Sequence, residues 1–95
     1  MAKHVFIFRG GVPETPEAGQ QKMEDWAAWL GGMGAAVLDP GSVTGPSEFV
    51  GPAAEPTTGY MLVDAPDLAA ARSHAEACPI RDWGGSVEVA TAVEM

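Results

Sequence analysis

The fold of this chain is decided by its first apolar run, Lys3-His4-Val5-Phe6-Ile7-Phe8-Arg9. Branched and aromatic side chains favour extended backbone, and the glycine pair Gly10-Gly11 that follows favours a turn. Alternate positions place Val5 and Ile7 on one face of the strand and the two phenylalanines on the other. A strand that is apolar on both faces has to be covered on both.

Three further segments have the composition of strands. Residues 35–39 read as a short strand stopped by Pro40-Gly41, and residues 59–64 as a strand with apolar residues on both faces. In residues 86–93 the valines alternate with polar or small residues, which is typical of an edge or partly exposed strand.

Two amphipathic helices separate these strands. Thr15 is a suitable N-cap for the first helix and Pro16 suits its first position. Its predicted core-facing stripe is Met23, Trp26, Leu30 and Met33, widened by Ala27 and Trp29. Asp67 is a suitable N-cap for the second helix, and Pro79 ends it. The predicted stripe of this helix is Leu68, Ala71, Ala75 and Cys78.

The order of elements is therefore β-α-β-β-α-β in one domain spanning residues 1–95, an α+β chain with the ferredoxin-like arrangement. This predicts a four-stranded antiparallel sheet with both helices on one face. We expect Phe6 and Phe8 on the opposite face, where nothing within the chain would cover them. An uncovered apolar face usually marks an interaction surface, so the sequence predicts a homodimer.

The segment from residue 40 to residue 57 is rich in Gly, Pro and Ser, with only Phe49 and Val50 available for burial. Loops of this length in compact domains are uncommon and often functional. We expect it to form a lid or a wall of a binding site.

Composition excludes several classes of function. A net charge of −8 with five scattered Lys and Arg residues disfavours nucleic acid. No apolar run is long enough to span a bilayer, and the start lacks the pattern of a signal peptide. A single cysteine, Cys78, leaves no internal disulfide. These features predict a cytoplasmic protein without a membrane partner.

Several blocks of the chain resemble the YCII-related proteins, especially their DGPF-type branch. The blocks are Gly59-Tyr60-Met61-Leu62-Val63, Leu68 with Ala71, Ala77-Cys78-Pro79, and Gly84-Gly85-Ser86-Val87-Glu88-Val89, with weaker likeness in Gly34 and Asp39-Pro40-Gly41. The resemblance covers most of the chain except residues 42–57. It implies a dimeric α-β barrel built from two ferredoxin-like subunits.

The chain departs from this family where some members carry a proposed catalytic His–Asp pair. The position of the histidine falls near Gly19, and the residue before the proline is Cys78. The DGPF tetrad is represented only by Thr44-Gly45-Pro46-Ser47. The proposed chemistry therefore does not carry over, and the catalytic residues are unknown.

Four residues are candidates for binding a small-molecule ligand. Arg9 suits a carboxylate or another anion at the end of the first strand, and Asp39 is a candidate partner for Arg9. His4 shares a strand face with the phenylalanines, so it is placed in the dimer interior, and Trp26 offers a stacking surface. Each residue has a structural role as the alternative. Arg9 and Asp39 would form an ion pair, His4 would be an interfacial histidine, and Trp26 would be a core aromatic.

The remaining polar residues offer little chemistry. Cys78 and His74 lie one helical turn apart, but the position of Cys78 at a helix C-terminus favours a buried structural thiol over a nucleophile. No spacing of His, Cys and Asp predicts a metal site, and no glycine motif predicts a nucleotide cofactor.

Three functions stay open from the sequence. The first is a homodimeric small-molecule binding or accessory protein. The second is an enzyme acting on a small acidic or aromatic metabolite, with His4, His74, Asp39 and Glu48 as the candidates for proton transfer. The third is a protein-interaction module that uses its sheet face for another partner.

Overall fold

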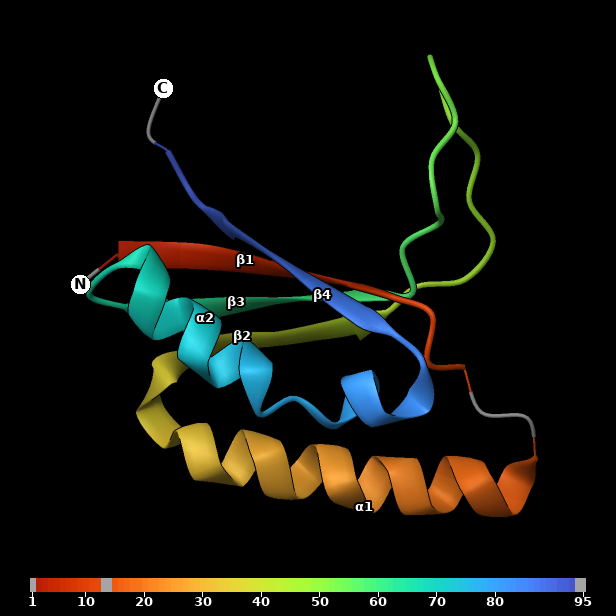
Figure 1. The fold of residues 1–95 in the computed structure, drawn as a ribbon, viewed down its shortest axis with the longest axis horizontal. Coiled ribbons are helices and arrows are strands. Elements are labelled where there is room, and N and C mark those ends of the chain that lie inside the picture. Colours follow the sequence, from red (N-terminus) through yellow and green to blue (C-terminus); the bar gives the residue numbers. More distant parts are fainter. Residues whose placement is uncertain (1, 13–14, 94–95) are drawn as a thin grey trace.

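A computed structural model of the protein describes residues 2–12 and 15–93. Four strands form one antiparallel sheet in the order β2-β3-β1-β4. They are β1 (Ala2–Arg9), β2 (Val37–Val43), β3 (Gly59–Ala65) and β4 (Ser86–Thr91), joined by helices α1 (Pro16–Met33) and α2 (Leu68–Glu76) and by the short 3₁₀ helices η1 (Gly34–Ala36) and η2 (Pro79–Trp83). Figure 1 shows both long helices on one side of the sheet. The predicted ferredoxin-like α+β fold is confirmed.

Both predicted helix caps are present. The Thr15 hydroxyl accepts a hydrogen bond from the Ala18 amide at 3.1 Å, and an Asp67 carboxylate oxygen accepts one from the Ala70 amide at 2.8 Å. Each side chain satisfies an amide that has no partner inside its helix. The predicted stripes are correct only in part, because Met23 and Leu68 are largely exposed. Trp29 and Met33 are the buried residues of α1.

The prediction for the phenylalanines is wrong, because Phe6 and Phe8 lie on the helix side of β1. Phe6 is fully buried and stacks on Trp29 with ring centroids 6.3 Å apart. Phe8 packs edge-on against Trp26 at 4.8 Å. The helices need large side chains beneath them to fill the space, and the bulkier face of β1 supplies them.

The opposite face of the sheet, which we call the open face, is apolar at its centre. Val5 and Ile7 of β1 lie there, half-buried, between the neighbouring strands. Val5 pairs with Leu62 and Ala90, and Ile7 pairs with Tyr60 and Glu88. The sheet therefore has an uncovered apolar face, but this face is formed by Val5 and Ile7 and not by the phenylalanines.

Strand β2 is longer than predicted and irregular. It continues through Pro40 and Gly41, and its register with β3 shifts twice, once between Val37 and Asp39 and once between Asp39 and Ser42. Gly41 has a φ of +70°, and a Cβ there would overlap the carbonyl oxygen of Tyr60. The Asp39 carboxylate accepts a hydrogen bond from the Gly41 amide at 2.8 Å and stabilises this bend. The Pro40-Gly41 pair thus bends the strand and does not end it.

Residues 44–58 form a long connection between β2 and β3, which we call the arm. Figure 1 shows it projecting from the end of the sheet, on the side away from the helices. Hydrogen bonds fix its base: the Thr58 amide donates to the Phe8 carbonyl at 2.7 Å, and the Thr44 amide donates to the Thr58 carbonyl at 3.1 Å. The predicted surface loop is therefore an extended arm with an anchored base.

Candidate functional site

The candidate site is a hollow between the open face and the arm, with a volume of about 480 Å³. Its floor is formed by Val5, Ile7 and Tyr60 from the sheet. Residues of the arm form its wall, and among them are Phe49, Ala54 and Glu48. The arm thus forms one wall of this hollow.

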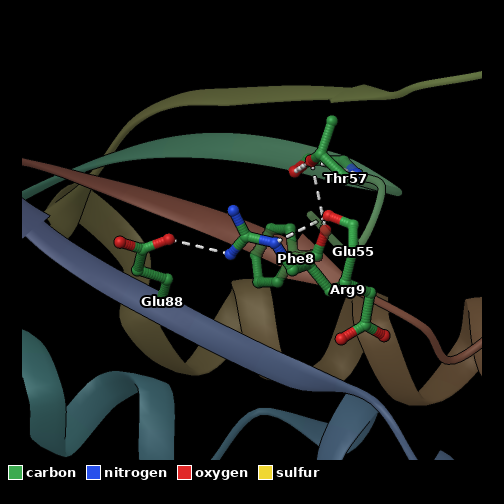
Figure 2. A network of polar contacts seen from close by, with 6 residues as sticks. Phe8, Arg9, Glu55, Thr57 and Glu88 are labelled. Carbon is green, nitrogen blue, oxygen red and sulfur yellow. Dashed lines mark hydrogen bonds and ion pairs between the residues drawn. The ribbon is translucent and has the colours of Figure 1, made fainter. Parts of the chain in front are cut away.

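Arg9 lies at the edge of this hollow and joins three parts of the fold. Its Nη1 donates to a carboxylate oxygen of Glu88 on β4 at 2.8 Å, and its Nε donates to the Glu55 carbonyl of the arm at 3.3 Å. Figure 2 shows the guanidinium between these two groups. A guanidinium has five N–H donors, so donors remain for a ligand. Because the side chain is 26% exposed, such a ligand can reach it.

Threonine hydroxyls hold the arm beside Arg9. The Thr57 hydroxyl lies 3.1 Å from the Phe8 carbonyl oxygen (Figure 2) and 3.0 Å from the Gly59 carbonyl oxygen, so these two acceptors share its single proton. The Thr58 hydroxyl donates to the Gly10 carbonyl at 3.0 Å. Strand β1 and the arm are therefore fixed relative to each other, which orients the Arg9 side chain before any ligand arrives.

The four predicted ligand-binding residues do not come together. Arg9 lines the hollow, whereas His4 and Trp26 lie on the helix side of the sheet. Asp39 is exposed on β2 and caps Gly41, so the predicted pairing of Asp39 with Arg9 is wrong. No local pattern of residues indicates that Glu88 is the partner of Arg9. That pairing follows from the register of β1 on β4, which places Glu88 opposite Ile7.

His4 is a core residue with one unusual atom. It is 1% exposed, and its Nδ1 lies 3.0 Å from the Ala2 carbonyl oxygen, which assigns the proton to Nδ1 because a carbonyl only accepts. Its Nε2 is buried and has no hydrogen-bond partner among the described residues. The placement of His4 in a dimer interior is therefore wrong, since the helices cover this face.

Trp26 and Trp29 form the aromatic part of the core. Trp26 is half-buried, with its ring centroid 4.9 Å from that of Trp29 and 6.2 Å from that of Trp83. The indole N–H of Trp29 donates to the His74 carbonyl at 3.0 Å, which joins the two helices. Trp26 thus packs as a core aromatic and does not face the hollow.

Cys78 is buried, and burial raises the pKa of its thiol to about 11. A thiol that stays protonated at neutral pH is a poor nucleophile. This agrees with the structural role expected from the sequence. Within residues 2–12 and 15–93, no group of three His, Cys, Asp or Glu side chains is placed to hold a metal ion.

The Cys78 thiol predicts a pH dependence of stability. Below pH 9 the thiol is protonated in both states, and between about pH 9 and 11 only the unfolded state loses the proton. The free energy of unfolding should fall across this interval by at most about 3 kcal/mol. Denaturant titrations at pH 8 and pH 10.5 test this, with Cys78→Ala as the control. If the free energy of unfolding fell equally in the Cys78→Ala variant, titratable groups other than the Cys78 thiol would be its cause.

The comparison with solved structures supports the fold. No family model matches the chain, and no curated protein matches it in sequence. Among solved structures, it is similar to 5-chloro-2-hydroxyhydroquinone dehydrochlorinase from Burkholderia phenoliruptrix AC1100 in complex with 2,5-dihydroxybenzoquinone. The TM-score is 0.64 at 16% identity, and the match covers 97% of this chain and 95% of that one. At this identity the likeness shows the shared fold alone.

Among the helices of the described residues, none combines the length and the apolar character needed to cross a bilayer.

Proposed function

We propose that this chain is a YCII-related, homodimeric protein of the cytoplasm that binds a small planar molecule in the hollow beside Arg9. The observation that carries the ligand proposal is the combination of an apolar floor, formed by Val5, Ile7 and Tyr60, with a guanidinium fixed at its edge. Ligand sites are commonly apolar hollows with a few placed polar groups. A flat ring would pack on the apolar floor, and oxygen atoms on its edge would accept hydrogen bonds from the Arg9 guanidinium.

The similar dehydrochlorinase supports this choice of ligand class. It was solved with 2,5-dihydroxybenzoquinone, a small flat ring with oxygen atoms on its edge. Oxygen atoms of this kind suit the planar donor set of arginine. The compound is therefore a suitable first probe for the hollow.

A second subunit packed on the open face would cover the hollow and the sheet residues around it. Tyr60 is 41% exposed, and Val5, Ile7 and Leu62 are half-buried in the single chain. An apolar face of this kind resembles the core of an interface. Packing of two open faces against each other would give the dimeric α-β barrel that the sequence resemblance implies, with two equivalent hollows.

Binding is favoured over catalysis because of the residues in the hollow. Both histidines lie elsewhere: His4 is buried under the helices, and His74 belongs to α2. Of the residues named from the sequence for proton transfer, only Glu48 lines the hollow. An enzyme acting on a small metabolite stays the second candidate, because the similar structure is an enzyme. In that case Glu48 is the proton-transfer group to test.

We expect Arg9→Gln to weaken the binding of 2,5-dihydroxybenzoquinone at least tenfold, since a charge-assisted hydrogen bond contributes about 1.5–3 kcal/mol. Titration calorimetry on the full chain measures this. Arg72→Gln, a change of an exposed arginine outside the hollow, is the matched control and should bind like the parent chain. Equal affinity of the Arg9 variant would place the probe elsewhere, and no binding by the parent chain would exclude this ligand class.

A further inference from the structure

The hollow beside Arg9 is surrounded by more negative than positive charge. Arg9 is the only Lys or Arg among the described residues that line it, whereas Glu48 and Glu55 both line it. The Arg9 guanidinium is also bound to the Glu88 carboxylate at 2.8 Å, which offsets its charge. Lys3 shares this face of β1 but lies at the opposite end of the strand, roughly 20 Å away. One guanidinium and three carboxylates therefore lie in or beside the hollow.

The two acidic residues of the arm differ in their surroundings. The arm runs outward from β2 and returns to β3 (Figure 1), and residues of both limbs line the hollow. Glu55 belongs to the returning limb, and its carbonyl accepts the Arg9 Nε hydrogen bond at 3.3 Å. Glu48 belongs to the outgoing limb, and neither of the ion pairs that the described residues form includes it. The Glu48 carboxylate therefore remains available to a ligand.

A ligand in this hollow meets a hydrogen-bond donor from β1 and an acceptor from the arm. The Arg9 guanidinium only donates, and the Glu48 carboxylate only accepts. The floor of Val5, Ile7 and Tyr60 offers an apolar surface to a ring. An anionic ligand would be attracted by Arg9 but repelled by Glu48 and by the net charge of −8 of the chain. A ring that also carries a cationic nitrogen would suit both groups.

We propose that the hollow selects a flat ring with an acceptor oxygen on one side and a cationic nitrogen on the other, and that Glu48 selects the nitrogen. The oxygen accepts a hydrogen bond from Arg9, and the nitrogen donates one to the Glu48 carboxylate. A second subunit on the open face would exclude water and strengthen both charge contacts. The inference rests on the proposed function and narrows its ligand class, because a ring with two carboxylates would be repelled by Glu48.

Titration calorimetry with two probes tests this selection. The probes are 4-(aminomethyl)benzoate, which carries a carboxylate and an ammonium group, and terephthalate, which carries two carboxylates on the same ring. The full chain should bind 4-(aminomethyl)benzoate at least about tenfold more tightly than terephthalate. In Glu48→Gln this ratio should fall by about fivefold or more, because the amide keeps the shape of the side chain and removes its charge. Equal or tighter binding of terephthalate by the parent chain would overturn the proposal.

Glu24→Gln is the matched control, because Glu24 is exposed on α1 and does not line the hollow. This variant should bind the two probes with the same ratio as the parent chain. Ionic strength gives a second readout, since a preference caused by charge should shrink as salt is added. A ratio that survives both Glu48→Gln and added salt would show that the shape of the probe causes the preference, and the proposal would be wrong.

Binding of 2,5-dihydroxybenzoquinone separates a failure of this inference from a failure of the site itself. If that compound binds and depends on Arg9, while the two benzoates bind equally or not at all, the role of Glu48 is wrong and the site beside Arg9 stands. If none of the three compounds binds the parent chain, the site and the role of Glu48 are both wrong.

Discussion

Replacing Phe6 by alanine should lower the free energy of unfolding by about 3–5 kcal/mol, the usual cost of removing a buried aromatic ring. Phe6 is completely buried and stacks on Trp29, so truncation leaves a cavity at the centre of the core. A small domain has only about 5–15 kcal/mol of stability in total, and much of it would be lost. Chemical denaturation followed by tryptophan fluorescence measures the effect.

The matched control for this prediction is Ile7→Ala, a truncation of the next residue on the same strand. Ile7 lies on the open face and is only half-buried in the single chain. Ile7→Ala should lower the free energy of unfolding clearly less than Phe6→Ala does when unfolding is measured on dilute, dissociated chains. If the Phe6 variant were as stable as the Ile7 variant, the assignment of the phenylalanines to the helix side would be wrong.

Replacing Ile7 by glutamate should weaken the homodimer at least a hundredfold while the fold of each subunit is retained. The change introduces a charge at the centre of the open face, and an unpaired charge in an apolar interface costs several kcal/mol. In the single chain the glutamate would still reach water, because this face is only half-buried. Sedimentation equilibrium measures the association, and circular dichroism reports whether the fold is kept.

Met23→Glu is the control for this change. Met23 is 74% exposed on α1, on the helix side of the molecule, and a charge there should leave the association unchanged. An Ile7→Glu variant that associates like the parent chain would exclude the open face as the interface. A variant that is monomeric and folded would locate the interface on this face.

Local signals in the sequence were sufficient for the elements and their order. The caps Thr15 and Asp67 lie where their side chains predict, because capping depends on residues only a few positions away. The order of the elements then restricts the topology to a few arrangements. The fold followed from this short-range information.

The orientation of β1 and the composition of the hollow were not predictable in the same way. Both faces of this strand are apolar, so its pattern does not indicate whether Phe6 or Ile7 faces the helices. That choice depends on the volume available between the sheet and the two tryptophans of α1. The partner of Arg9 depends on the pairing of β1 with β4, which are far apart in the sequence. Pro40-Gly41 was misread because a bulge and a strand end have the same local signal.

Native mass spectrometry of the protein purified gently from cells is the decisive test of the dimer and its ligand, because it reports assembly and retained ligand together. We expect the mass of two chains with an added small mass, and loss of that added mass in the Arg9→Gln variant. A single chain without any added mass, at a concentration where the parent protein is folded, would contradict both the covered open face and the site beside Arg9.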